Sequence, residues 1–198
     1  FCKVNKFEIN SRQTKIVFLL DKFIKPQKKI LKYLLNPKQK LCFYLQGNVG
    51  VGKTMLLNFV YNELKIKKLK LHFNEFMIKF HDFRHKKYNG NSIRSFVKNL
   101  KERYDLIYLD EFQVTNIVDA MILGKLFQII FNENIKVIIT TNTKLNDLYK
   151  DGLQREQFLP FISIIKRNSI QKELILDDDY RLKNKNQSKR IFYPLNSK

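Results

Sequence analysis

One run of residues in the sequence matches a complete phosphate-binding loop, G-x-x-x-x-G-K-T. It consists of Gly47, Asn48, Val49, Gly50, Val51, Gly52, Lys53 and Thr54. The glycines let the backbone turn tightly, so that successive N–H groups point at phosphate oxygens beside the positive end of a following helix. Lys53 would neutralise the β and γ phosphates, and the Thr54 hydroxyl would bind Mg²⁺. An apolar stretch precedes the loop and an amphipathic stretch follows it, which disfavours the alternative of an incidental Gly-rich turn.

Two adjacent carboxylates, Asp110 and Glu111, follow a second apolar stretch that predicts a strand. A phosphate loop needs a metal-holding acid at the end of a neighbouring strand, and Asp110 would hold Mg²⁺ there through water. Glu111, aimed the other way, would polarise the attacking water as a general base. The pair favours hydrolysis over nucleotide binding alone. The alternative is an ordinary acidic turn after a strand.

A third polar position, Asn142, ends the apolar run from Val137 to Thr141. Here a third strand would bring an amide to the γ-phosphate, where it could orient the water. A Thr-Thr-Asn strand end is by itself more often simple turn chemistry. Its place in the chain, after the loop and the acid pair, favours the functional interpretation.

Alternating strands and helices must position these groups. We expect strands at Leu41–Gln46, Lys68–Phe73, Leu106–Asp110, Val137–Thr141 and Ile170–Leu176. We expect helices at Lys53–Lys65, Glu75–Lys86, Ser92–Arg103, Ile117–Phe131 and Leu153–Lys166. This alternation predicts an α/β fold with a parallel sheet covered on both faces.

The ends of the chain differ from this middle part. An opening helix with Ser11 placed to cap it, and a short helix at Lys28–Leu35, are expected before the core. The expected organisation is an N-terminal helical segment at 1–38, a nucleotide-binding core at 39–178 and a basic, hairpin-like extension at 179–198. The chain begins with Phe1, not Met, so we expect it to be a piece of a longer protein.

Composition narrows the class of protein. The 198 residues include 38 Lys and Arg against 18 Asp and Glu, a formal net charge of +20. With 44% hydrophobic residues a disordered chain is excluded, and two cysteines are too few for a disulfide framework. No apolar run approaches the roughly 18 residues that a membrane span needs. Because Lys far outnumbers Arg, we interpret the charge as a lysine-biased surface and expect no dedicated nucleic-acid site.

The phosphate loop, the acid pair and the asparagine occur in an order that is typical of one protein family. The chain resembles the AAA+ ATPases of the AFG-one-like and ZapE (lactation-elevated) family, from about Phe7 to Leu195. The specific blocks are His72-Phe73, Phe76-Met77, Asp110 to Thr115, Asp119 to Leu123, Asp147-Leu148-Tyr149, Gly152 to Arg155, Phe158 to Ile162 and Asp179-Tyr180-Arg181. Three departures lie outside the predicted nucleotide shell: Asn116 and Val118 replace the usual Asp and Ala, and Lys144-Leu145 lacks an expected proline.

The resemblance implies a P-loop NTPase with a RecA-like AAA+ core, a five-stranded, mainly parallel sheet in the order 5-1-4-3-2, and ATP with Mg²⁺ as cofactors. It also implies a homo-oligomeric, hexameric ring in which each site is completed by the neighbouring subunit. Arg155 would then be the arginine finger that acts in trans, although a helix-capping surface arginine is the alternative. Arg167 and Arg181 are weaker choices. The helical lid that follows the core in the family is missing from this chain, so weak isolated activity is expected.

The resemblance further implies an ATPase that remodels a protein partner. That partner would belong to the division machinery in a bacterium, with a cytoplasmic location and peripheral association with the inner face of the membrane. In a eukaryote it would be a respiratory-chain subunit or another target of membrane-protein quality control in mitochondria. Two alternatives stay open: a nucleic-acid-linked ATPase of the helicase-loader type, which would use the +20 charge, and a nucleotide-binding module that does not hydrolyse ATP.

Several other residues have two interpretations. Phe76 and Met77 stand where a ring ATPase could carry pore residues, but Phe76, Phe80 and Phe83 fall at near-helical spacing, which favours core packing. His81 and His85 have the i, i+4 spacing of metal ligands, but no acidic companion is in register, and zinc is disfavoured. Cys42 is expected to be a small core residue.

Overall fold

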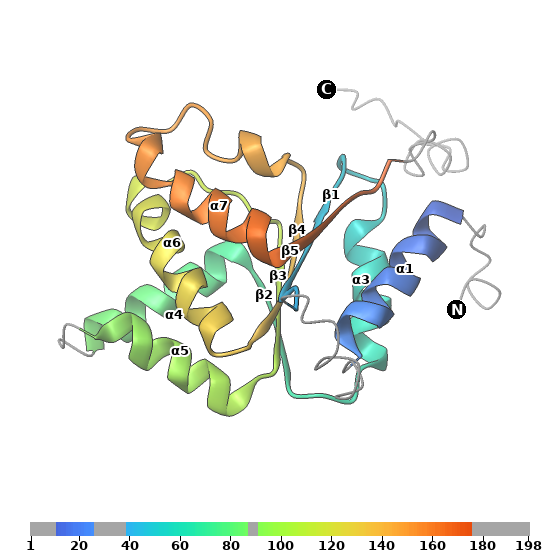
Figure 1. Cartoon of the computed structure of the whole chain (residues 1–198), viewed down its shortest axis with the longest axis horizontal. Helices are drawn as coiled ribbons and strands as arrows, with labels where there is room; N and C mark the ends of the chain where they lie inside the picture. The colour runs from blue at the N-terminus through green and yellow to red at the C-terminus, as the bar shows by residue number, and fades with distance from the viewer. Residues whose placement is uncertain (1–10, 26–38, 87–90, 176–198) are drawn as a thin grey trace, which may run out of the picture.

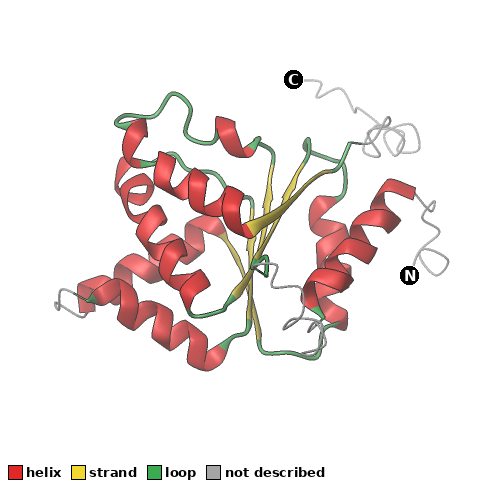
Figure 2. Ribbon diagram, viewed as in Figure 1, coloured by secondary structure: helices red, strands yellow, loops and turns green. Residues whose placement is uncertain are grey.

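A five-stranded sheet forms the middle layer of the molecule. Helices cover both of its faces (Figure 2). The computed structural model describes residues 11–25, 39–86 and 91–175. The strands are β1 Cys42–Gln46, β2 Lys68–His72, β3 Leu106–Asp110, β4 Lys136–Thr141 and β5 Ser169–Glu173. Their order is β2-β3-β4-β1-β5, and every neighbouring pair is parallel. The predicted α/β fold and the predicted strand order are both confirmed.

The helices divide into two groups by the face of the sheet that they cover. The helices are α1 Ser11–Ile24, α3 Lys53–Glu63, α4 Phe73–Lys86, α5 Ser92–Arg103, α6 Ile117–Asn132 and α7 Leu159–Asn168. Figure 1 shows α1 and α3 on one face and α4 to α7 on the other. The three central strands β1, β3 and β4 are therefore buried on both sides, which is why they read as continuous apolar runs.

Most predicted elements are present, with boundaries shifted by one to a few residues. Phe73 and Leu174, both predicted to belong to strands, lie outside them, and Phe73 instead begins α4. The helix after the phosphate loop ends at Glu63, because Leu64 turns extended at φ −77° and ψ 126°. Ser11 is the first residue of α1.

The prediction of one helix over Leu153–Lys166 is wrong in its first half. Gln154 adopts a left-handed conformation at φ 52°, which a continuous helix cannot contain. A single 3₁₀ turn, η2, follows at Arg155–Gln157, and α7 begins only at Leu159, with Pro160 in its first turn. Proline is favoured in the first turn because its missing N–H needs no partner there. Another 3₁₀ turn, η1, lies at Leu145–Asp147.

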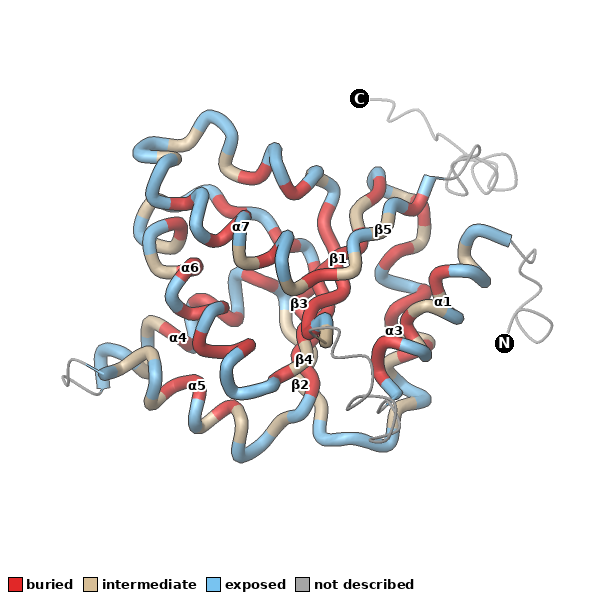
Figure 3. The backbone as a smooth tube through the Cα atoms, viewed as in Figure 1, coloured by how far each residue is buried: buried red, intermediate tan, exposed pale blue. Residues whose placement is uncertain are grey.

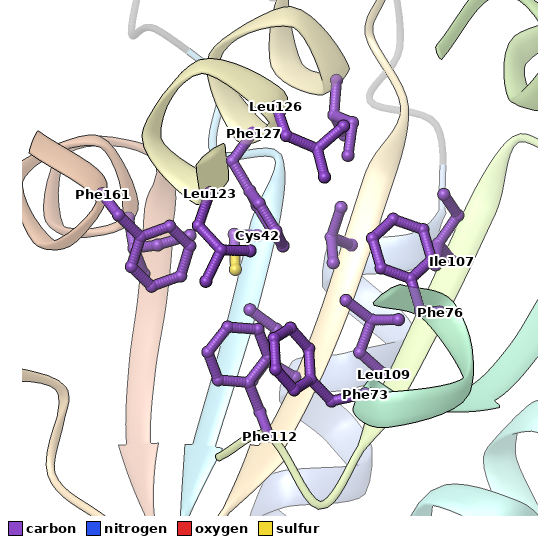
Figure 4. Close-up of a cluster of buried hydrophobic side chains, with 14 of the residues drawn as sticks. Cys42, Phe73, Phe76, Ile107, Leu109, Phe112, Leu123, Leu126, Phe127 and Phe161 are labelled. Carbon is purple, nitrogen blue, oxygen red and sulfur yellow. The ribbon is translucent and has the colours of Figure 1, made fainter. Parts of the chain in front are cut away.

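Buried residues occur along the strands and in the helices on both faces of the sheet (Figure 3). Their side chains form one cluster on each face. The cluster under α4 to α7 is the larger and is rich in phenylalanine (Figure 4). Phe112 packs in this cluster, with ring centroids 4.2 Å from Phe73 and 5.5 Å from Phe161. The cluster under α1 and α3 is smaller and mostly aliphatic.

Two predicted elements fall outside the described residues. They are the short helix at Lys28–Leu35 and the hairpin-like extension at 179–198.

Candidate functional site

The carboxyl ends of three adjacent strands meet at one pocket. β1, β4 and β3 are neighbours in the parallel sheet, so the residues that follow them lie at the same edge. The pocket has a volume of about 330 Å³. It is lined by Val49, Gly50, Gly52, Lys53, Thr54, Met55, Asp110, Glu111, Thr140, Thr141 and Asn142. The structure thus brings together the phosphate loop, the acid pair and the asparagine that the sequence singled out.

The loop conformation depends on its glycines. Gly50 and Gly52 have φ values of 90° and 84°, a region that residues with a Cβ rarely adopt. Gly47 has a different reason, because a Cβ there would stand 2.4 Å from the backbone oxygen of Leu174. The loop then leads directly into α3, whose first residue is Lys53, so its N–H groups lie at a helix N-terminus.

The Lys53 ammonium lies against this loop, and the residue is almost fully buried. Its Nζ donates to the oxygens of Gly47 at 2.6 Å and Asn48 at 2.9 Å, and to Oδ1 of Asn142 at 2.8 Å. These three contacts hold the ammonium beside the loop backbone and Asn142. A cationic donor at this position can make charge-assisted hydrogen bonds to phosphate oxygens.

Asp110 is buried at the end of β3, and one oxygen of its carboxylate accepts several hydrogen bonds. Its Oδ1 accepts hydrogen bonds from the Thr54 hydroxyl at 3.3 Å and from the Glu111 N–H at 3.1 Å. The Thr140 hydroxyl also donates to Oδ1. Asp110 and Thr54, the two residues predicted to hold Mg²⁺, are therefore in contact.

Glu111 points differently from Asp110. Its backbone takes a left-handed conformation at φ 54°, and its side chain is 74% exposed while lining the pocket. Oε2 of Glu111 lies 3.5 Å from Nδ1 of His72, the last residue of β2. The left-handed turn separates the two adjacent carboxylates: one is buried against β4, and the other is open to water.

Asn142 follows β4 and faces the loop. Its amide oxygen accepts from Lys53, as described, so the predicted third polar group is in the pocket. The two preceding threonines hold the strand ends together. The Thr141 hydroxyl donates to the Phe112 oxygen at 2.8 Å, and the Phe112 N–H donates to the Thr140 oxygen at 2.8 Å.

Arg155 does not line the pocket of its own chain. It begins the 3₁₀ turn η2, not an α-helix, and its Nη2 donates to the backbone oxygen of Asn146 at 2.5 Å. Its Nε is buried without a hydrogen-bond partner among the described residues. The structure thus leaves the predicted role of Arg155 in a neighbouring subunit as a prediction.

The other residues with two interpretations are now placed. Phe76 and Met77 are buried, at 1% and 3% exposure, so core packing is confirmed over a pore-facing position. His81 is in contact with Asp119 of α6 at 2.7 Å, a helix-to-helix contact. Cys42 is fully buried, as predicted, and this burial raises the pKa of its thiol.

Two contributors were not found from the sequence. Thr140 had no special signal beyond its place in a Thr-Thr-Asn strand end, yet it donates to the buried carboxylate. Gln13 of α1 donates to the backbone oxygen of Val51 at 3.4 Å, so the opening helix supports the phosphate loop. Nothing in the sequence spacing links these two segments, because they meet only through the packing of α1 on α3.

The groups that line the pocket are those that a nucleotide with Mg²⁺ requires. Hydroxyl and carboxylate oxygens are the ligands that Mg²⁺ prefers, usually with waters between. Thr54 and Asp110 supply one of each at the foot of the pocket. The loop backbone and Lys53 supply donors for phosphate oxygens, the chemistry of a triphosphate site.

The helices of residues 11–25, 39–86 and 91–175 include none with the length and apolar character that a membrane span requires.

Comparison with known sequences gives consistent results. The family model described as AFG1-like ATPase matches residues 10–198. Lactation elevated protein 1 homolog B of Danio rerio is 36% identical over 164 residues, which cover 76% of this chain and 33% of that protein. Cell division protein ZapE of Escherichia coli K12 is 34% identical over 154 residues, which cover 77% of this chain and 41% of that protein. The chain therefore spans well under half the length of these curated relatives.

Solved structures share the fold at low sequence identity. The crystal structure of DnaI superposes with a TM-score of 0.59 at 21% identity and covers 85% of this chain and 84% of that chain. Domain III of the Thermotoga maritima replication initiation protein DnaA gives 0.58 at 15% identity and covers 88% and 67%. These likenesses support the P-loop fold, and the family match is carried by the sequence. The chain belongs to the family of AFG1-like ATPases.

Proposed function

We propose that the chain is the nucleotide-binding core of a Mg²⁺-dependent ATPase that remodels a protein partner. The observation that carries the proposal is the convergence of Lys53, Asp110, Glu111 and Asn142 on one pocket beside the phosphate loop. The family match supports the same activity. ATP is the proposed nucleotide, and Mg²⁺ bound with it would polarise the phosphate oxygens and offset their charge.

Each residue then has a separate task. Lys53 exchanges its uncharged oxygen partners for phosphate oxygens, and the loop N–H groups bind the same phosphates. Thr54 and Asp110 hold the metal, Asp110 through water. Glu111 takes the proton from the attacking water, a role that its exposed position in the pocket permits. Asn142 orients that water at the γ-phosphate.

Glu111→Gln tests the hydrolytic step. The amide keeps the size of the side chain but cannot accept the proton, so turnover should fall by about 10²- to 10⁴-fold while ATP still binds. Steady-state phosphate release and binding of a fluorescent ATP analogue measure the two effects. Glu102→Gln, at an exposed position on α5, is the control. Equal turnover in Glu111→Gln and the unchanged chain would instead indicate a binding module without hydrolysis.

Arg155 is proposed to act on the site of a neighbouring subunit in a hexameric ring. Its position outside the pocket of its own chain supports this, and mixing two inactive variants tests it. Arg155→Ala has an intact pocket, and Lys53→Ala keeps its arginine. A mixture of the two should recover part of the turnover if Arg155 acts in trans. No recovery in mixed rings would contradict the role.

The partner is proposed to be a protein, and the bacterial relative named as a cell division protein suggests the division machinery. For a mitochondrial protein, it would be a respiratory-chain or other membrane-associated target, with peripheral membrane association in either case. The Glu111→Gln variant should retain the partner in a pull-down with ATP. The same protein with Lys53→Ala should not, because it lacks bound nucleotide.

The net charge of +20 favours one second candidate, a nucleic-acid-linked ATPase of the helicase-loader type. Binding of single-stranded and duplex DNA across a salt series tests it. A steep loss of affinity with salt, together with stimulation of ATP turnover by DNA, would favour this candidate over protein remodelling.

A further inference from the structure

Tyr108 is a buried side chain in the middle of β3, and its hydroxyl makes no hydrogen bond to any residue that the structure describes. The residue is 1% exposed, and the hydroxyl oxygen has no partner among the described residues. A buried hydroxyl without a partner is costly, so such groups are uncommon in folded proteins. Tyr44 of β1 is equally buried but donates to the backbone oxygen of Thr143 at 2.9 Å. The two tyrosines therefore differ in what their hydroxyls do.

The surroundings of the Tyr108 hydroxyl are the metal-binding groups. Tyr108 lies two residues before Asp110, so both side chains leave β3 on the same face of the sheet. Asp110 lies close enough to the Tyr108 hydroxyl to influence it, and a tyrosine hydroxyl can donate a hydrogen bond to a carboxylate. Thr140 and Thr54 also lie close enough to influence it. None of these three residues meets the hydroxyl with the geometry of a hydrogen bond.

Asp110 offers the matching acceptor. The three hydrogen bonds that the described residues make to its carboxylate all end on Oδ1. A carboxylate has about four lone-pair sites on two oxygens, so Oδ2 keeps its capacity to accept. The Tyr108 hydroxyl and the Asp110 carboxylate therefore lie on the same face of β3, and Oδ2 of Asp110 can accept the hydrogen bond that the hydroxyl can donate.

The Tyr108 ring is held in place from two sides. Its centroid is 6.3 Å from that of Tyr61 on α3, and the Lys70 ammonium lies 5.4 Å from it. Lys70 is itself fixed by a 2.5 Å hydrogen bond to Asn58 of α3. With the ring fixed, the hydroxyl stays where it is, and the shorter side chain of Asp110 is the part that can rotate.

We propose that Tyr108 is a positioning residue for Asp110. When Asp110 turns to receive the hydrated Mg²⁺ of a bound nucleotide, the Tyr108 hydroxyl donates a hydrogen bond to its carboxylate and sets its orientation. The inference rests on the proposed function for the presence of that metal. In the nucleotide-free chain the hydroxyl contributes no hydrogen bond, and in the loaded chain it contributes one to a charged group, where such bonds are strongest.

Tyr108→Phe, which removes only the hydroxyl, gives two measurements. In the protein without nucleotide, its melting temperature should be unchanged or higher. Tyr44→Phe loses a real hydrogen bond and should melt about 2–4 °C lower. A Tyr108→Phe variant that loses as much as Tyr44→Phe would overturn the proposal, because its hydroxyl would then already be bonded in the free protein.

The second measurement is the Mg²⁺ dependence of binding of a fluorescent ATP analogue. Tyr108→Phe should need about 3- to 10-fold more Mg²⁺ than the unchanged chain for half-maximal binding of the analogue. In EDTA, where no Mg²⁺ is free, the two proteins should bind the analogue equally. Tyr61→Phe, on the neighbouring helix, should match the unchanged chain in both. An unshifted Mg²⁺ midpoint in Tyr108→Phe overturns the role of Tyr108. An unchanged chain that shows no Mg²⁺-dependent binding contradicts the proposed function itself.

Discussion

The two faces of the sheet hold the same strands by different means. On the α4 to α7 face, phenylalanine rings pack edge to face and stacked around Phe112. On the α1 and α3 face, the packing is aliphatic and includes polar groups, among them Tyr108 and the lysines of β2. The aromatic face fixes where the strand ends lie, and the other face carries the phosphate loop and the metal-binding pair. The groups proposed to act on the nucleotide therefore lie on one face of the sheet, and the larger aromatic core lies on the other.

Phe112→Ala should have the largest effect, because it removes a fully buried ring that packs against Phe73, Phe127 and Phe161. Phe112 also lies next to Glu111, its N–H donates to the Thr140 oxygen, and its oxygen accepts from the Thr141 hydroxyl. Truncating a buried phenylalanine costs about 3–5 kcal/mol of unfolding free energy. Urea unfolding measures the loss. Phe18→Ala is the control, because Phe18 is 67% exposed and its removal should change stability by less than about 0.5 kcal/mol.

Thr140→Val tests the polar side of the comparison. The isosteric change removes the hydroxyl that donates to the buried Asp110, which should cost about 1.5–3 kcal/mol in urea unfolding. Ser169→Ala removes a buried hydroxyl that has no partner among the described residues, and it should cost far less. If both variants unfold at the same urea concentration, the Thr140 hydrogen bond contributes nothing to stability.

Asn116→Ala examines a helix end on the aromatic face. The Asn116 side chain accepts from the Val118 N–H at 2.7 Å and caps α6, so its loss should cost about 1 kcal/mol. Asn91 stands at the same position before α5 but makes no side-chain capping bond. Asn91→Ala should therefore leave the unfolding transition in place. A larger loss for Asn91→Ala than for Asn116→Ala would contradict this account.

Lys136→Met should have the smallest effect, and its sign depends on pH. The Lys136 ammonium donates to the backbone oxygens of Phe23 and Ile24 at 2.9 Å, at the end of α1, and burial lowers its pKa. The unfolded chain then binds more protons than the folded chain between the lowered pKa and the ordinary value of 10.5, so stability rises with pH across that window. Urea unfolding at several pH values should show this rise in the unchanged chain relative to Lys136→Met. Parallel profiles for the two proteins would refute it.

Sequence reasoning worked best where one local pattern decides the outcome. The phosphate loop is one continuous segment, and the strands before Asp110 and Asn142 are short apolar runs with polar ends, so their place at one edge follows from a parallel sheet. It failed at Leu153–Lys166, where the apolar spacing continues but the backbone of Gln154 turns left-handed. That turn is not visible in hydrophobic periodicity, because it depends on how the segment reaches α7.

The sequence by itself determined the nucleotide loop, the acid pair, the alternation of strands and helices, and the family. Each of these depends on residues that are neighbours in the chain or that match a family pattern in order. Tertiary structure alone decided that Thr140 donates a hydrogen bond to Asp110 and that Gln13 supports the phosphate loop. It also decided that the Tyr44 hydroxyl is hydrogen-bonded, while that of Tyr108 has no partner in the part of the chain that the structure describes. The reason is physical: these contacts join segments far apart in the chain, and their geometry is set only when both faces of the sheet have packed.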